Sequence, residues 1–80
     1  MISTRRVIDY SIVEADDTEY YVEGICTRGS RFYSETFMSL NDAYKTFDLY
    51  KALVKYFGGG TVELIAHKDN RYVTVCPAVL

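Results

Sequence analysis

Few residues of this chain are able to carry catalysis. It holds a single histidine, His67, and two cysteines, Cys26 and Cys76. A serine or cysteine hydrolase requires a base within hydrogen-bond reach of its nucleophile, whereas a histidine beside a predicted hairpin turn is usually an exposed side chain. We therefore expect a protein that is not an enzyme and has no catalytic residue.

Metal and cofactor sites are also weakly indicated. Cys26 and Cys76 lack the close spacing of zinc ligands. The adjacent carboxylates Asp16 and Asp17 lie in a predicted turn, where neighbouring side chains usually point apart into solvent. The glycines at 58–60 follow a predicted helix and lack the lysine of a phosphate-binding loop. The expectation is no metal ligand and no cofactor.

Binding is better supported, because acidic residues cluster near the start of the chain with no basic residue among them. They are Glu14, Asp16, Asp17, Glu19 and Glu23. Their shared charge predicts a negative potential at the tip of a hairpin, which would attract an arginine- and lysine-rich surface of a protein partner. The alternative, an acidic edge that only keeps the sheet soluble and blocks edge-to-edge pairing, stays open.

Tyrosine is unusually frequent, with 8 tyrosines and no tryptophan in the chain. A small core satisfies few phenolic hydroxyl groups, so some rings must face outward, where tyrosine is enriched at interface hot spots. Tyr21, Tyr33 and Tyr56 lie off the predicted core positions, the first two near Glu23 and Glu35. The alternative, that these tyrosines are ordinary exposed strand residues chosen only for their β-propensity, stays open. The predicted partner-binding residues are Glu14, Asp16, Asp17, Glu19, Tyr21, Glu23, Tyr33 and Glu35.

Length and composition limit the class of protein. The 80 residues allow one domain, residues 1–80, and the 49% hydrophobic and 25% charged content is typical of a folded chain. A net charge of −2 provides no basic field for a phosphate backbone. No apolar run approaches the roughly 18 residues that span a bilayer. We expect a cytoplasmic protein that binds neither nucleic acid directly nor a membrane.

Apolar and polar residues alternate in the first half of the chain, which predicts strands. The predicted strands cover residues 6–14, 19–27 and 31–38. In the second strand one parity forms the predicted core face, namely Tyr20, Val22, Gly24 and Cys26. Neither parity of the third strand is cleanly apolar, so its facing is not predicted.

Ser39 begins a different pattern, because its hydroxyl can cap a helix whose first turn contains Asp42. An apolar stripe then recurs at steps of three and four residues, at Leu40, Ala43, Tyr44, Phe47, Tyr50, Val54 and Phe57. The glycines at 58–60 end the predicted helix.

A second hairpin follows the helix, with strands over residues 61–67 and 71–76 that Pro77 closes. The predicted fold is α+β, an antiparallel sheet of about five strands in the order β-β-β-α-β-β, with one amphipathic helix on one face. The other face must be solvated or covered, so a homodimer stays open alongside a protein target.

A short acidic chain, rich in tyrosine and beginning with methionine, resembles the small inhibitors that bacteriophages make against host defences, anti-CRISPR proteins among them. The resemblance covers size, charge and architecture over the full length, and no motif supports it. It implies a stoichiometric binder in the host bacterial cytoplasm that occludes a basic nucleic-acid-binding or subunit-interface surface of a defence complex. It transfers no functional residue.

Three alternatives stay open. From Glu19 to Phe57 the order of strands and helix is similar to the sheet-helix domain of HicB-type antitoxins, which neutralise a protein partner, although the expected Pro-Gly signature is replaced by residues 27–30. The chain also fits a small self-associating structural protein. The third alternative is a small enzyme or metal protein, which only His67, Cys26 and Cys76 support.

Overall fold

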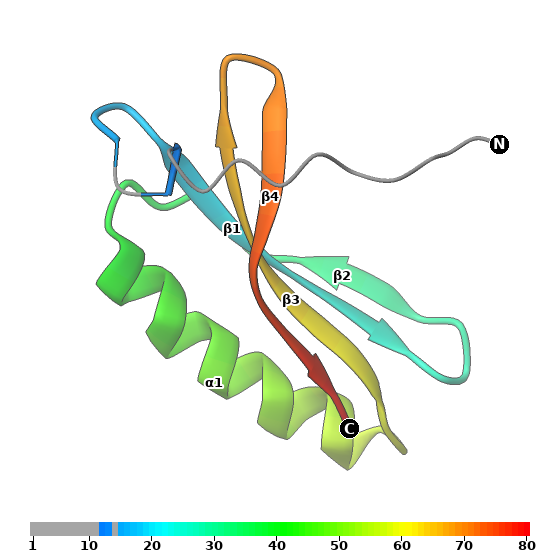
Figure 1. Cartoon of the computed structure of the whole chain (residues 1–80). Helices are drawn as coiled ribbons and strands as arrows, with labels where there is room; N and C mark the ends of the chain where they lie inside the picture. Colours follow the sequence, from blue (N-terminus) through cyan, green and yellow to red (C-terminus); the bar gives the residue numbers. More distant parts are fainter. Residues whose placement is uncertain (1–11, 14) are drawn as a thin grey trace, which may run out of the picture.

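Four strands and one helix make up the part of the chain that the computed structural model describes, residues 12, 13 and 15–80. They are β1 (Glu19–Cys26), β2 (Arg31–Tyr33), α1 (Leu40–Tyr56), β3 (Gly60–Lys68) and β4 (Arg71–Val79). The strands form one antiparallel sheet in the order β2-β1-β3-β4, and α1 lies along one of its faces (Figure 1). The predicted α+β class, with one helix on an antiparallel sheet, is confirmed.

The predicted strand over residues 6–14 lies outside the described residues, apart from Ile12 and Val13. These two residues lie in a turn and not in a strand. The Thr18 hydroxyl donates a hydrogen bond to the carbonyl oxygen of Ile12, and the Tyr20 hydroxyl donates one to that of Val13. Ile12 is buried and belongs to the core. Four strands are therefore described where about five were predicted.

β1 and β3 form the centre of the sheet, and their pairing creates the core. Val22 lies opposite Leu64, and Gly24 lies opposite Val62. Directly opposed residues of an antiparallel pair point to the same face, which here is the face that α1 covers. Val22, Val62 and Leu64 are fully buried, and each such side chain contributes roughly 1.5–3 kcal/mol to folding. The predicted core face of β1 is confirmed.

β2 is shorter than the predicted strand over 31–38, because the hydroxyl of Ser34 replaces a backbone partner. The Val22 amide donates to Ser34 Oγ over 2.8 Å, and the Ser34 amide donates to the Val22 carbonyl oxygen. A side chain that competes in this way for backbone donors interrupts a ladder. One further bridge, between Tyr20 and Phe37, follows the interruption.

The helix begins and ends close to the predicted positions. Ser39 Oγ accepts a hydrogen bond from the Asp42 amide, as the capping pattern predicts. The apolar stripe packs Ala43, Phe47 and Val54 against the sheet. Phe57 was predicted to belong to this stripe, but it follows the last helical residue and is 51% exposed. The prediction for Phe57 is wrong because the chain leaves the helical path at Tyr56.

Pro77 does not close the last strand, which continues to Val79. β4 is the edge strand of the described sheet, and proline is tolerated where the missing amide would face away from the ladder. The register shifts between Leu64 and Ile65, so Cys76 lies opposite Leu64 and Thr74 lies opposite Ile65. The regular register from the hairpin turn up to this point places the Thr74 side chain on the face away from the helix.

Gly60 allows the chain to return from the helix directly beside β1. Its φ is 151°, and a Cβ at this position would lie 2.0 Å from the carbonyl oxygen of Ile25. No residue with a side chain fits here without moving the backbone of one of the two central strands. By contrast, a Cβ at Gly58, which has a φ of 102°, would meet no atom within 4 Å.

We expect Gly60→Ala to lower the free energy of unfolding by about 2–4 kcal/mol, because it adds a backbone clash to the conformational penalty. Gly58→Ala is the matched control and carries only the conformational term of about 1–2 kcal/mol. Urea denaturation followed by circular dichroism measures both values. Equal losses of unfolding free energy for the two variants would show that the close approach of β3 to β1 adds nothing to the cost of the Gly60 substitution.

Candidate protein-binding face

The face of the sheet opposite α1 gathers aromatic and acidic side chains from all four strands. We call it the helix-free face. Register and alternation place on it Glu19, Tyr21, Glu23, Ile25, Arg31, Tyr33, Thr61, Glu63, Ile65, His67, Tyr72, Thr74, Pro77 and Val79. Four of the predicted partner-binding residues, Glu19, Tyr21, Glu23 and Tyr33, thus lie together on one surface.

Two carboxylates occupy the centre of the helix-free face. Glu23 of β1 and Glu63 of β3 lie directly opposite each other, an arrangement that destabilises a sheet when both side chains carry the same charge. Arg31 Nε lies 3.4 Å from Glu23 Oε2, and the Thr74 hydroxyl donates to Glu63 Oε1 over 2.9 Å. One guanidinium therefore balances two carboxylates, and a net negative charge remains at the centre.

Aromatic rings border this carboxylate pair. The Tyr21 and Tyr33 rings have centroids 6.3 Å apart, and His67 stacks on Tyr72 at 4.3 Å with an angle of 14° between the planes. A shallow hollow of about 520 Å³ lies between them, lined by Tyr21, Glu23, Glu63, Ile65 and Tyr72. Tyr33 and Tyr72 are half exposed. The surface thus combines flat rings with carboxylates.

The environment of Tyr21 reflects this combination. Burial raises the pKa of its phenol above the usual 10.0, and the neighbouring Tyr72, Glu23, Tyr33 and Glu63 raise it further. Both effects disfavour the phenolate, because burial removes water and the neighbours are negative or become so. Tyr21 therefore stays a neutral hydrogen-bond donor and acceptor throughout the physiological range.

The other predicted residues lie elsewhere. Asp16 and Asp17 are exposed in the turn before β1, and Glu35 is exposed in the loop after β2. Lys68 Nζ, from the end of β3, donates a hydrogen bond to the Asp16 carbonyl oxygen. The fold thus adds one lysine to the acidic turn, whose predicted negative potential stays a prediction. Glu14 lies outside the described residues.

Sequence reasoning did not identify Glu63 and Tyr72 as members of the site. The alternation of Glu63 with Val62 and Leu64 already placed it off the core face. Its position opposite Glu23 depends on the pairing of β1 with β3, and local patterns contain no signal for that pairing. Tyr72 joins the surface through its stack on His67 across the β3–β4 hairpin.

The residues that could do chemistry are separated in the fold. His67 Nδ1 lies 3.7 Å from Glu19 Oε1 on the helix-free face, whereas Cys26 is buried on the helix side and Cys76 is partly buried. Neither cysteine forms a disulfide. Among residues 12, 13 and 15–80, no group of three or more histidine, cysteine and acidic side chains is placed to hold a metal ion. In the same part of the chain, no helix is both long enough and apolar enough to cross a membrane.

Comparison of this chain with models of protein families, with curated proteins and with solved structures gave no match. Function is therefore argued from the surface itself.

The raised pKa of Tyr21 predicts a specific loss of stability in alkali. The folded-state pKa of Tyr21 lies above the unfolded value of about 10. The contribution of Tyr21 to the free energy of unfolding is therefore fully present below pH 10 and is lost as the pH rises through the folded pKa. Tyr21→Phe should make the decline in the free energy of unfolding above pH 10 shallower. Tyr56→Phe, at a ring that is 82% exposed, should leave the decline unchanged. Superimposable pH profiles for Tyr21→Phe and the unmodified protein would contradict the assignment.

Proposed function

We propose that this protein is a non-catalytic binding protein whose helix-free face docks on a basic surface of a protein partner. The observation that carries the proposal is the opposed Glu23 and Glu63 pair, with its aromatic border, at the centre of the sheet. Like charges directly opposed cost stability, and a cation from a partner would turn this cost into a favourable interaction. Tyrosine rings add flat contact area that can also stack on a guanidinium.

Charge supports a basic protein over the other partners. A nucleic acid would bring phosphates against Glu19, Glu23 and Glu63, which repel them. A second copy docked through the same face would place these carboxylates near their own counterparts. An arginine- or lysine-rich protein surface meets complementary charge and aromatic rings together. A homodimer through this face is correspondingly disfavoured.

The wider role in this proposal is inhibition by occlusion. A sheet face with carboxylates can compete with nucleic acid for a basic channel, or cover a basic subunit interface, of a bacterial defence complex. This is the mode of action implied by the resemblance to small phage inhibitors. The proposal places the protein in the cytoplasm of the host, where the free thiols of Cys26 and Cys76 would remain reduced.

The direct test is affinity capture from nuclease-treated bacterial lysate with variants of matched charge. Glu63→Lys reverses a charge at the centre of the helix-free face, and Asp48→Lys makes the same change on the helix, where Asp48 forms only an exposed pair with Lys51. We expect a partner bound by the unmodified protein and by Asp48→Lys to be lost with Glu63→Lys. Tyr21→Ala should weaken binding roughly 30-fold, mainly through faster dissociation.

Thermal denaturation establishes that each variant is folded before capture. A partner retained equally by Glu63→Lys and the unmodified protein would place the interface elsewhere. The complete absence of a protein partner would overturn the proposed function.

Asp16 and Asp17 test whether electrostatic steering, the long-range attraction between opposite charges, speeds association with the partner. Both are exposed beside β1, and neither carboxylate lies in the central hollow. Replacing both with lysine should slow association with the captured partner and flatten its dependence on salt, while the dissociation rate changes little. Stopped-flow or surface-based kinetics at two salt concentrations measures this effect. An unchanged association rate would remove steering from the proposal and leave the helix-free face as the whole interface.

A further inference from the structure

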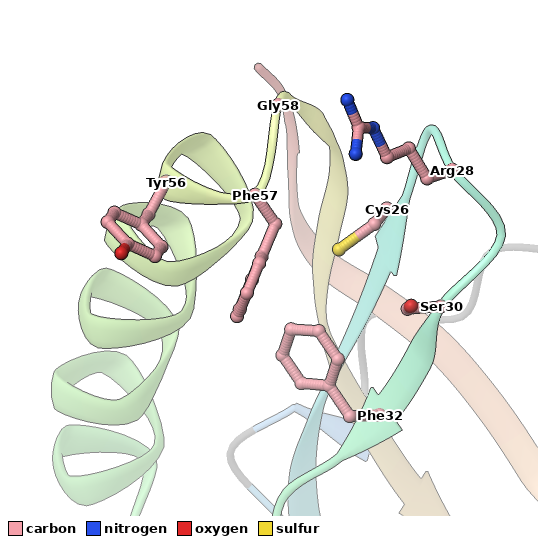
Figure 2. A pocket seen from close by; sticks show the side chains of 7 residues that line it. All are labelled: Cys26, Arg28, Ser30, Phe32, Tyr56, Phe57 and Gly58. Atoms are coloured by element: carbon pink, nitrogen blue, oxygen red, sulfur yellow. The ribbon is translucent and has the colours of Figure 1, made fainter.

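A second hollow lies on the helix side of the molecule, between the end of α1 and the β1–β2 turn. Its volume is about 640 Å³, within the range of small-molecule sites. Figure 2 shows the residues that line it: Cys26, Arg28, Ser30, Phe32, Tyr56, Phe57 and Gly58. None of them belongs to the helix-free face, so this hollow is separate from the proposed protein interface.

The walls are apolar and aromatic. The sulfur of Cys26 and the rings of Phe32 and Phe57 point into the same space (Figure 2). The Phe32 ring packs on Tyr50 with centroids 5.1 Å apart. A Cβ at Gly24 would lie 2.8 Å from the Phe32 ring, so glycine lets this ring lie against β1. Phe57 leaves half of its surface exposed beside the hollow, which is ready contact area for an apolar ligand.

Backbone hydrogen bonds hold both sides of the hollow in place. The Cys26 amide donates to the Ser30 carbonyl oxygen over 2.7 Å and closes the β1–β2 turn. The Thr27 amide donates to the Gly59 carbonyl oxygen over 2.9 Å and joins this turn to the segment after the helix. Because the walls are already held in place, ligand binding costs little free energy for ordering the turn and the side chains.

Arg28 decides the charge of the ligand. It is the only lining residue that is charged at neutral pH, and the described residues offer its guanidinium neither an ion pair nor a hydrogen bond. Its side chain extends from the turn toward Gly58 at the rim (Figure 2). A free guanidinium fits a carboxylate with two parallel hydrogen bonds.

The end of the helix beside the hollow is capped by the amides that follow it. The carbonyl oxygens of Leu53, Val54 and Lys55 accept hydrogen bonds from the amides of Phe57, Gly58 and Gly59. These hydrogen bonds compensate part of the negative charge that the end of a helix carries. An aromatic wall with one guanidinium that has no partner among the described residues favours an anion that carries a ring.

We propose that this hollow binds a small aromatic carboxylate, with its ring between Phe32 and Phe57 and its carboxylate on Arg28. The inference does not depend on the proposed function, because the two surfaces share no residue. The ligand binds without a covalent step, and the free thiol of Cys26 contributes only apolar contact.

The test uses 2-naphthoate as the probe and 2-naphthylmethanol as its neutral counterpart, each titrated into the ¹⁵N-labelled protein. We expect naphthoate to shift the amides of Arg28, Gly29, Ser30 and Gly58. Arg28→Gln should weaken naphthoate binding about tenfold, the value of one charge-assisted contact, and leave naphthylmethanol binding unchanged. Phe57→Ala should weaken both probes.

Lys45→Gln is the control for net charge, since Lys45 is exposed near the opposite end of α1, and it should bind naphthoate like the unmodified protein. No shift of the four amides at up to about 10 mM naphthoate, or equal affinity of Arg28→Gln and the unmodified protein, would overturn the inference. Tyr21→Ala should bind naphthoate normally and Arg28→Gln should retain the captured protein partner, so failure of either proposal is recognised separately.

Discussion

The pairing of β1 with β3 is the constraint on which the rest of the structure depends. The two strands are joined from Glu19 opposite His67 to Cys26 opposite Gly60, and every other element is attached to one of them. α1 connects β2 to β3 and packs on both central strands. The pairing therefore determines at once which side chains enter the core, where the helix lies, and which charges meet on the other face.

The two sides of this ladder have different chemistry for one reason. Successive residues of a strand point to opposite faces, so Val22 and Leu64 are buried under α1 while their neighbours Glu23 and Glu63 meet on the helix-free face. The core leaves little freedom for register, because a slip of one residue would bury the carboxylates. The same register that makes a good core thus forces an unfavourable charge pair on the opposite surface.

The hollow beside Arg28 arises from the ends of the same ladder. Gly60 brings β3 against Ile25, and the adjoining glycines carry the chain from Tyr56 across the end of β1. The β1–β2 turn and the end of the helix are thereby held facing each other, with Phe57 outside the helix and partly exposed. The two proposed sites consequently lie on different faces of one small sheet.

Local patterns in the sequence were sufficient for the elements whose signals are short in range. The capping hydroxyl of Ser39, the apolar stripe of α1 and the alternation in β1 involve residues a few positions apart, so their spacing alone predicts them. The same is true of the β3–β4 hairpin around Asp69 and Asn70, whose positive φ values suit a tight turn. Predictions failed where the tertiary setting of a residue overrode its local pattern: Ser34 shortened β2, and the edge position of β4 in the described sheet accommodated Pro77.

The sequence by itself therefore determined the fold class, the face of β1 that is buried, and the excess of tyrosine and acidic residues that must reach the surface. Only the tertiary structure decided that Glu63 and Tyr72 join Glu23 and Tyr21, that Lys68 approaches the turn at Asp16, and that Arg28 and Phe57 line the same hollow. The physical reason is the distance along the chain over which each signal acts. Periodicity and capping are properties of neighbouring residues, whereas register between strands far apart in the chain is chosen by the packing of the whole core.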